Sequence, residues 1–208
     1  MIKNLFDPSK DLNRRIESVV TFADKTSEDL SREINEYIVT DNLRGSYKKV
    51  IEELQDGFAN GSNEIGVWIS GFYGSGKSSF AKYLGYSFDS SLIVDGMSFA
   101  DKLLNRIDDV KIKACHNVIR KNNPLVVLID LTTEQTAGKT STVSDIIYKE
   151  TMKLLGITTT EPKVAEFELL LRIEGKYDEF VQLVKDRKGK DWQDVSVKSH
   201  AVANLYAA

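Results

Sequence analysis

The sequence predicts an α/β protein in which a parallel β-sheet is flanked by helices, with a helical segment before the sheet and a mainly helical part after it. Two short apolar runs, residues 65–69 and 125–131, are rich in β-branched residues and are typical of buried strands. Helical patterns separate the two runs, and alternating strands and helices favour a parallel sheet. A glycine-rich turn joins the first run to the helix that follows it.

Residues 1–25 show little periodicity and are expected to form a packed arm. Two helices are expected next, the first capped by Ser27 and the second by Asp41, and Gly61 is expected near the end of the second. Their apolar residues at helical spacing are Leu30, Ile34, Tyr37 and Ile38, then Leu43, Tyr47, Val50, Ile51, Leu54 and Phe58.

After the first strand, the spacing of Phe80, Leu84 and Phe88 predicts a helix. Residues 92–94 are compatible with a second strand or with a loop. One long helix is expected over 98–121, and further helical segments over 143–155, 162–173 and toward the end. These elements suggest three parts: residues 1–62 as an arm and helices packing on the site, 63–135 as a partial sheet core, and 136–208 as a helical continuation.

The composition limits the classes of function. The 208 residues carry a net charge of −3, which gives no chain-wide positive field for nucleic acid or anionic lipid. No apolar run approaches the ~20 residues that cross a bilayer, and no signal peptide is recognisable, so we expect a soluble, cytoplasmic protein. Cys115 and the tryptophans Trp68 and Trp192 are expected in the core, and the two histidines are not expected to bind a metal.

The turn after the first strand fits the phosphate-binding pattern G-x-x-x-x-G-K-[ST] at every fixed position. Its glycines leave room for backbone N–H groups to surround a polyphosphate, and the following helix N-terminus favours an anion. Lys77 would bring a full positive charge to the β- and γ-phosphates, as the residue assigned to catalysis, and Ser78 would bind Mg²⁺. The residues predicted to bind nucleotide here are Gly71, Phe72, Tyr73, Gly74, Ser75, Gly76, Lys77, Ser78 and Ser79.

A phosphate loop of this kind works with a second acidic group, usually an Asp at the end of an apolar strand. Asp130 ends such a run and is the second metal candidate beside Ser78. It could equally be a polar residue that merely ends a buried strand. Many ATPases place a Glu directly after this Asp, but Leu131 stands there and Glu134 comes three residues later.

Around the loop, IGVWISGFYGSGKSSF over residues 65–80 resembles the corresponding segment of the large ATPase of BREX phage-defence systems, the BrxC/PglY family. Residues 33–40, EINEYIVT, and 12–16, LNRRI, are also similar to segments of that family. This chain departs from the family pattern at Tyr73, where Phe is usual, and at Ser79, where His is usual; neither change should block phosphate binding.

The resemblance implies a P-loop NTPase fold of the AAA+/origin-recognition-like kind, with ATP and Mg²⁺ as cofactors. It implies that helices over 27–59 cover the adenine, with Tyr37 and Thr40 near the base; simple core packing is the alternative for Tyr37. It also implies that this chain is the N-terminal part of a longer protein whose catalytic acidic pair lies beyond Ala208. Other defence proteins are the implied partners, and DNA contact and oligomerisation stay open.

The resulting functional hypothesis is the ATP-binding part of a BREX-type P-loop ATPase, in which nucleotide drives conformational change and assembly. We expect the isolated chain to bind ATP but to hydrolyse it poorly, because no arginine finger can be assigned. Two alternatives remain from the sequence: a nucleotide-binding switch without significant hydrolysis, and a P-loop kinase acting on a small metabolite.

Overall fold

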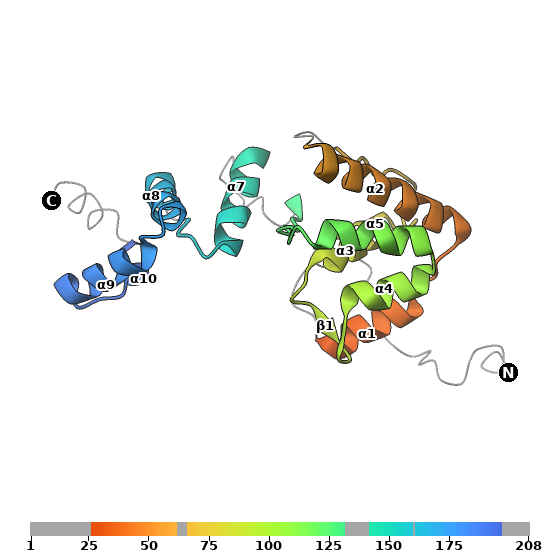
Figure 1. Ribbon diagram of the computed structural model, residues 1–208, viewed down its shortest axis with the longest axis horizontal. Coiled ribbons are helices and arrows are strands. Elements are labelled where there is room, and N and C mark those ends of the chain that lie inside the picture. The colour runs from red at the N-terminus through yellow and green to blue at the C-terminus, as the bar shows by residue number, and fades with distance from the viewer. Residues whose placement is uncertain (1–25, 62–65, 132–141, 160, 197–208) are drawn as a thin grey trace. The chain divides into compact units, whose positions relative to one another are not determined.

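In a computed structural model, the described residues are 26–61, 66–131, 142–159 and 161–196, and the chain divides into two compact units, Met1–Val126 and Val127–Ala208 (Figure 1). The predicted N-terminal arm, Ile65, Glu134 and His200 lie outside the described residues. The elements of the first unit are α1 (Ser27–Glu36), α2 (Asp41–Asn60), α3 (Lys77–Phe88), β1 (Ile93–Val94), β2 (Met97–Ser98), α4 (Phe99–Ile107) and α5 (Val110–Arg120). Those of the second are α7 (Val143–Leu154), α8 (Pro162–Ile173), α9 (Tyr177–Lys188) and α10 (Trp192–Ser196).

The predicted parallel α/β sheet, and with it the P-loop NTPase fold of the AAA+/origin-recognition-like kind, is wrong for the described part of the chain. That part is mostly helical, and its sheet consists of β1 and β2 paired antiparallel, with Val94 opposite Met97. The two runs expected as buried strands have no regular secondary structure at residues 66–70 and 125–130. An apolar run indicates where an extended strand could form, but the partner strand that would bond to it comes from distant sequence.

Both helices expected before the phosphate loop are present, with their N-caps one residue earlier than predicted. The hydroxyl of Thr26, not Ser27, accepts a hydrogen bond from the first turn of α1. Thr40 rather than Asp41 does the same for α2. The helix ends before Gly61, as expected, and Gly61 adopts a left-handed conformation. A hydroxyl cap satisfies one of the backbone N–H groups that a helix start leaves unpaired.

The single long helix predicted over 98–121 is two helices, α4 and α5. Asp108 adopts a left-handed conformation with φ 50° and ends α4. Asp109 then caps α5 by accepting a hydrogen bond from the backbone N–H of Ile112, at 3.0 Å. Aspartate tolerates the left-handed region and caps helices well, so this pair breaks a helix that apolar periodicity alone would continue.

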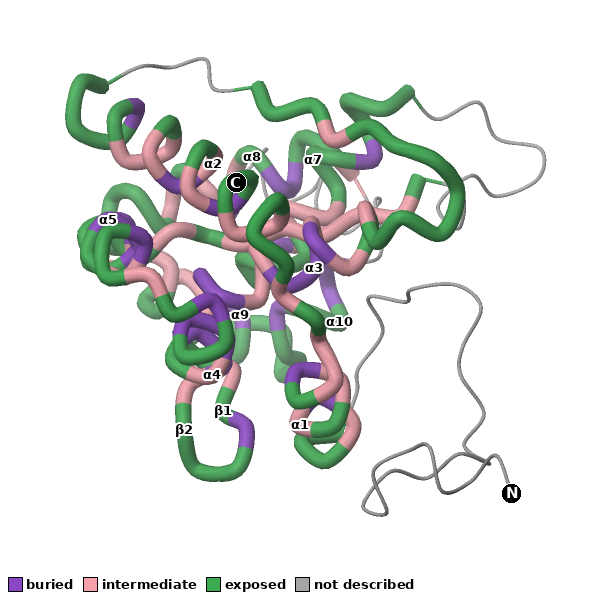
Figure 2. Tube along the Cα trace, turned by 90° about the vertical axis from the view of Figure 1, so that its right-hand side faces the viewer, coloured by how far each residue is buried: buried purple, intermediate pink, exposed green. Residues whose placement is uncertain are grey.

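The core of the first unit lies among α1 to α5 and β1, where buried stretches alternate with exposed ones along each helix (Figure 2). Most apolar positions predicted for these helices are buried, including Cys115, whereas Ile38 and Phe58 are exposed. The buried members are Leu30, Ile34, Tyr47, Ile51, Phe80, Tyr83, Phe88, Val94, Phe99, Leu103, Leu104, Ile107, Ile112, Cys115 and Ile119.

An aromatic contact and a buried salt bridge hold α3, the helix after the phosphate loop, against its neighbours. The rings of Tyr47 and Phe80 join α2 to α3 with centroids 4.4 Å apart. Lys82 of α3 is buried and forms a salt bridge with Glu33 of α1 at 2.9 Å. A buried charge is tolerated when it is paired in this way, so the polar contact fixes α1 on α3.

The second unit has a core of its own among α8, α9 and α10. Trp192 is buried there, as expected, and its indole N–H donates to the buried carboxylate of Glu168 at 2.6 Å. The other carboxylate oxygen accepts a hydrogen bond from the backbone N–H of Thr158 at 2.9 Å. Among the described residues, none of the helices has both the length and the apolar character needed to cross a bilayer.

Candidate functional site: the phosphate loop

The loop predicted to bind phosphate forms a turn directly before α3. Gly74 and Gly76 have φ of 76° and 85°, a region that residues with a β-carbon adopt at a cost. The ammonium group of Lys77 donates to the carbonyl oxygens of Gly71 at 3.0 Å and Phe72 at 2.7 Å. Lys77 therefore ties the start of the loop to the first residue of the helix.

The N-terminus of α3 differs from the other helix starts in the first unit. α1, α2, α4 and α5 each begin with a hydroxyl or carboxylate side chain that accepts from the first turn. The N-cap of α3 is Gly76, which offers no side chain, and the first helical hydrogen bond runs from Phe80 N to Gly76 O at 2.9 Å. The N–H groups before Phe80 thus have no intrahelical partner, and together with the helix dipole they favour an anion.

The loop is open to incoming ligand. Gly71 to Gly76 and Ser78 are exposed, and the side chains of Phe72 and Tyr73 are 92% and 94% exposed. Among the described residues, and apart from the chain neighbours of each glycine, no atom lies within 4 Å of where a β-carbon would stand on Gly74 or Gly76. An anion can therefore approach the backbone N–H groups without displacing a side chain at these two glycines.

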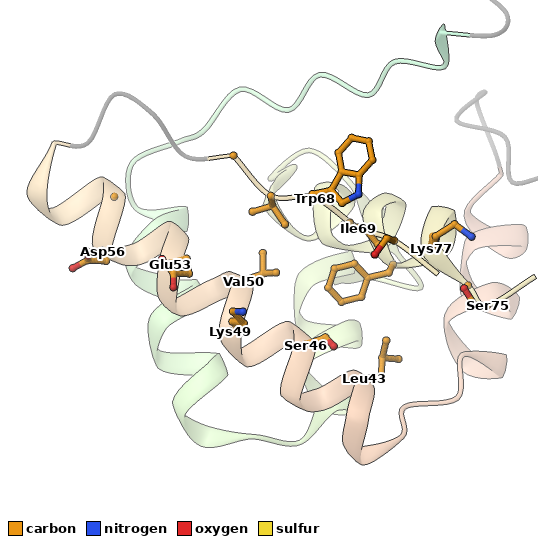
Figure 3. Close-up of a pocket in the computed structure, with 16 residues that line it drawn as sticks. Leu43, Ser46, Lys49, Val50, Glu53, Asp56, Trp68, Ile69, Ser75 and Lys77 are labelled. Carbon is orange, nitrogen blue, oxygen red and sulfur yellow. The ribbon is translucent and has the colours of Figure 1, made fainter. Parts of the chain in front are cut away.

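A groove of about 700 Å³ adjoins the loop, between α2 and the irregular segment before the loop (Figure 3). This volume lies within the ~300–1,000 Å³ typical of small-molecule sites. Its lining comes from α2, from residues 66–70 and from the start of α3, namely Leu43, Ser46, Lys49, Val50, Glu53, Asp56, Gly57, Gly66, Val67, Trp68, Ile69, Ser70, Ser75, Gly76, Lys77 and Phe80.

Trp68 lies in a different environment from the one predicted. It was expected in the core of a strand, but its side chain is 91% exposed and points away from α2 at the edge of the groove (Figure 3). Its neighbour Ile69 packs against the core of the first unit. Alternation of inward and outward side chains in an extended segment explains why only one of the two is covered.

The two residues predicted to lie near the base have structural partners in this fold. The ring of Tyr37 packs edge-on against Tyr83 with centroids 4.6 Å apart, and its hydroxyl lies 3.3 Å from that of Tyr47. Thr40 caps α2, and the next residues along the chain that line the groove are Leu43 and Ser46. A role for Tyr37 and Thr40 at the base stays a prediction, and the groove itself begins one turn later.

The two predicted metal ligands, Ser78 and Asp130, belong to different units of the chain. Ser78 is exposed in the first turn of α3, beside Lys77, where a hydroxyl fits the Mg²⁺ of a bound nucleotide. Asp130 belongs to the second unit, and the pair Ser78–Asp130 stays a prediction. Within the described ranges, no three His, Cys, Asp or Glu side chains gather into a metal site.

Sequence reasoning missed the polar face of α2. Ser46, Lys49 and Glu53 recur every three or four residues, and the buried residues Tyr47 and Ile51 lie on another face of the helix. That spacing was available in the sequence, but it is also the pattern of an ordinary solvated helix face. Only the groove beside α2 distinguishes a face that can bind a ligand from an ordinary solvated face.

No family model matches this chain, and no solved structure matches it.

Proposed function

We propose that residues 71–79 bind the polyphosphate of a nucleoside triphosphate, with ATP and Mg²⁺ as the natural ligand. The observation that carries this proposal is the uncapped N-terminus of α3, preceded by a turn with two glycines at positive φ and followed at once by Lys77. These features supply backbone donors, a helix dipole and a full positive charge at one place. Together they are the physical requirements for holding a chain of phosphates.

Each residue of the loop has a distinct part in this proposal. Gly74 and Gly76 let the backbone turn its N–H groups toward the ligand without a β-carbon in the way. Lys77, now bonded to two loop carbonyls, supplies the charge that neutralises phosphate oxygens. Ser78 would hold Mg²⁺ through its hydroxyl, and Mg²⁺ would neutralise charge between neighbouring phosphates.

The wider role follows only from the resemblance of residues 65–80 and 33–40 to the BREX ATPases. On that basis we place the chain in an anti-phage ATPase in which nucleotide binding drives conformational change and assembly with other defence proteins. The phosphate loop supports nucleotide binding. The role in phage defence would be tested by loss of phage resistance in cells that carry a Lys77→Ala variant of the gene.

The binding proposal is tested by titrating a fluorescent ATP analogue into the wild type and into Lys77→Ala. Loss of a charge-assisted contact is worth about 1.5–3 kcal/mol, so affinity should fall about ten- to a hundredfold. Lys121→Ala is the matched control, because Lys121 is an exposed residue at the end of α5 and does not line the groove. Equal affinity of wild type and Lys77→Ala would refute the proposal.

A further inference from the structure

The groove beside the phosphate loop has opposite charge at its two ends. Lys77 and the N-terminus of α3 lie at one end, and Glu53 and Asp56 of α2 line the other (Figure 3). Carboxylates repel phosphates, so an elongated anion with one neutral end has a preferred direction in such a groove. The phosphates belong at the loop, and the neutral end belongs near the carboxylates.

We propose that the base of the nucleotide occupies this groove and that Glu53 recognises the 6-amino group of adenine. This inference rests on the proposed function and names the part of the site that would distinguish one nucleotide from another. The groove volume of about 700 Å³ exceeds the need of a phosphate chain alone and suits a nucleoside beside it.

The chemistry of the α2 face fits an adenine ring. Val50, one turn before Glu53 on α2, and Phe80 supply apolar contact, which a planar base needs on its faces. An ionised Glu only accepts hydrogen bonds, and the 6-amino group of adenine only donates them along its outer edge. Lys49, one turn before Glu53 and in the same groove, is a donor for a ring nitrogen.

Hypoxanthine is the base that tests this pairing. It carries a carbonyl oxygen where adenine carries the 6-amino group, so Glu53 would face an acceptor and not a donor. A glutamine side chain has both donors and acceptors and tolerates either base. The identity of residue 53 should therefore set the preference between ATP and ITP, while binding of the phosphates alone should not depend on it.

The experiment measures affinities of ATP, ITP and inorganic tripolyphosphate by calorimetry for the wild type, Glu53→Gln and Glu52→Gln. Glu52 is the control, because it does not line the groove and is paired with Lys111 of α5. A hydrogen bond to a charged group corresponds to about a ten- to a hundredfold preference of the wild type for ATP over ITP. Glu53→Gln should remove most of that preference, Glu52→Gln should keep it, and tripolyphosphate should bind all three proteins alike.

Equal binding of ATP and ITP by the wild type would overturn the inference, as would an ATP preference that Glu53→Gln leaves intact. In either case, tripolyphosphate binding would show that the phosphate loop still works. Absence of any binding of tripolyphosphate and of ATP would instead refute the proposed function, and the inference with it. Because Glu53 is exposed, its replacement should leave the circular dichroism melting curve unchanged.

Discussion

His116 of α5 shows how burial sets the chemistry of a single residue in the first unit. Its ring is 1% exposed and stacks on Phe88 with centroids 4.5 Å apart. The hydroxyl of Ser87 donates to the carbonyl oxygen of Leu84, so the Nε2–H of His116 donates to Ser87 Oγ at 2.8 Å. The other ring nitrogen, Nδ1, is buried without a hydrogen-bond partner among the described residues. A neutral ring fits this site, and a charged ring does not.

Stability should therefore depend on pH through His116. Burial, with the nearby Arg120 guanidinium as a smaller cause, lowers the pKa of His116 from 6.5 to about 4. Below pH 6.5 the unfolded chain gains a proton that the folded chain refuses until about pH 4. The free energy of unfolding should fall by up to about 3 kcal/mol across that window from this group, and not at all above it.

Urea unfolding of wild type and His116→Gln at pH 7.5 and pH 4.5 measures this effect. The carboxylates titrate in both proteins, so the difference between them isolates the histidine. We expect the loss of stability on acidification to be smaller in the variant by about 2–3 kcal/mol. The same pH dependence in both proteins would show that His116 takes up its proton as readily in the fold as outside it.

The sequence predicted the local backbone of the phosphate loop better than it predicted the surroundings of individual side chains. The loop pattern at Gly71 to Ser78 correctly placed a glycine turn before a helix, because positive φ and an open N-terminus are local properties. The expected burial of Trp68 was wrong, because burial depends on what packs over a residue. Trp192, for which the core was favoured over an exposed position, is buried; its ring packs on Phe180 and its indole N–H bonds to Glu168.

At the scale of elements, the start of α3 is the feature on which the proposed function depends. Gly76 is its N-cap in a left-handed conformation, with open space where a β-carbon would stand. Gly189 is in the same situation at the end of α9 in the second unit, with φ 64° and open space around it. An alanine at either position meets a backbone cost of about 1–2 kcal/mol and no clash.

Gly76→Ala and Gly189→Ala should therefore lower stability by similar amounts but differ in nucleotide affinity. Only the first shifts the N–H groups at the start of α3 and so should weaken ATP binding at least tenfold. Thermal unfolding gives the first quantity and titration with a fluorescent ATP analogue gives the second. If both variants kept wild-type affinity, the conformation of Gly76 would have no part in binding.

The helices themselves were largely predictable, because caps and apolar spacing are encoded within each one. α1, α2, α3, α7 and α8 lie close to their predicted ranges. The break between α4 and α5 was not predicted, since apolar periodicity continues through it. There the conformation of Asp108 and the capping by Asp109 prevail over the periodicity.

At the scale of the molecule, the prediction of a parallel β-sheet was wrong for the described residues. Residues 66–70 and 125–130 have the composition of strands, yet strand pairing is a contact between distant segments that composition does not specify. In the described residues, helices pack against one another where a sheet was predicted to form the core. Helices α1 to α5 form one core, and α8 to α10 form another. The phosphate loop and the groove beside it belong entirely to the first unit.

The proposed function requires that the N-terminus of α3 binds the phosphates of a nucleotide. The most direct measurement is the backbone amide spectrum of the ¹⁵N-labelled protein during titration with Mg-ATP. We expect saturable shifts in the amide signals of Gly74, Gly76, Lys77, Ser78 and Ser79, and shifts of the same signals on addition of tripolyphosphate. Signals of these residues that stay fixed while others move, or a spectrum that does not change, would contradict it.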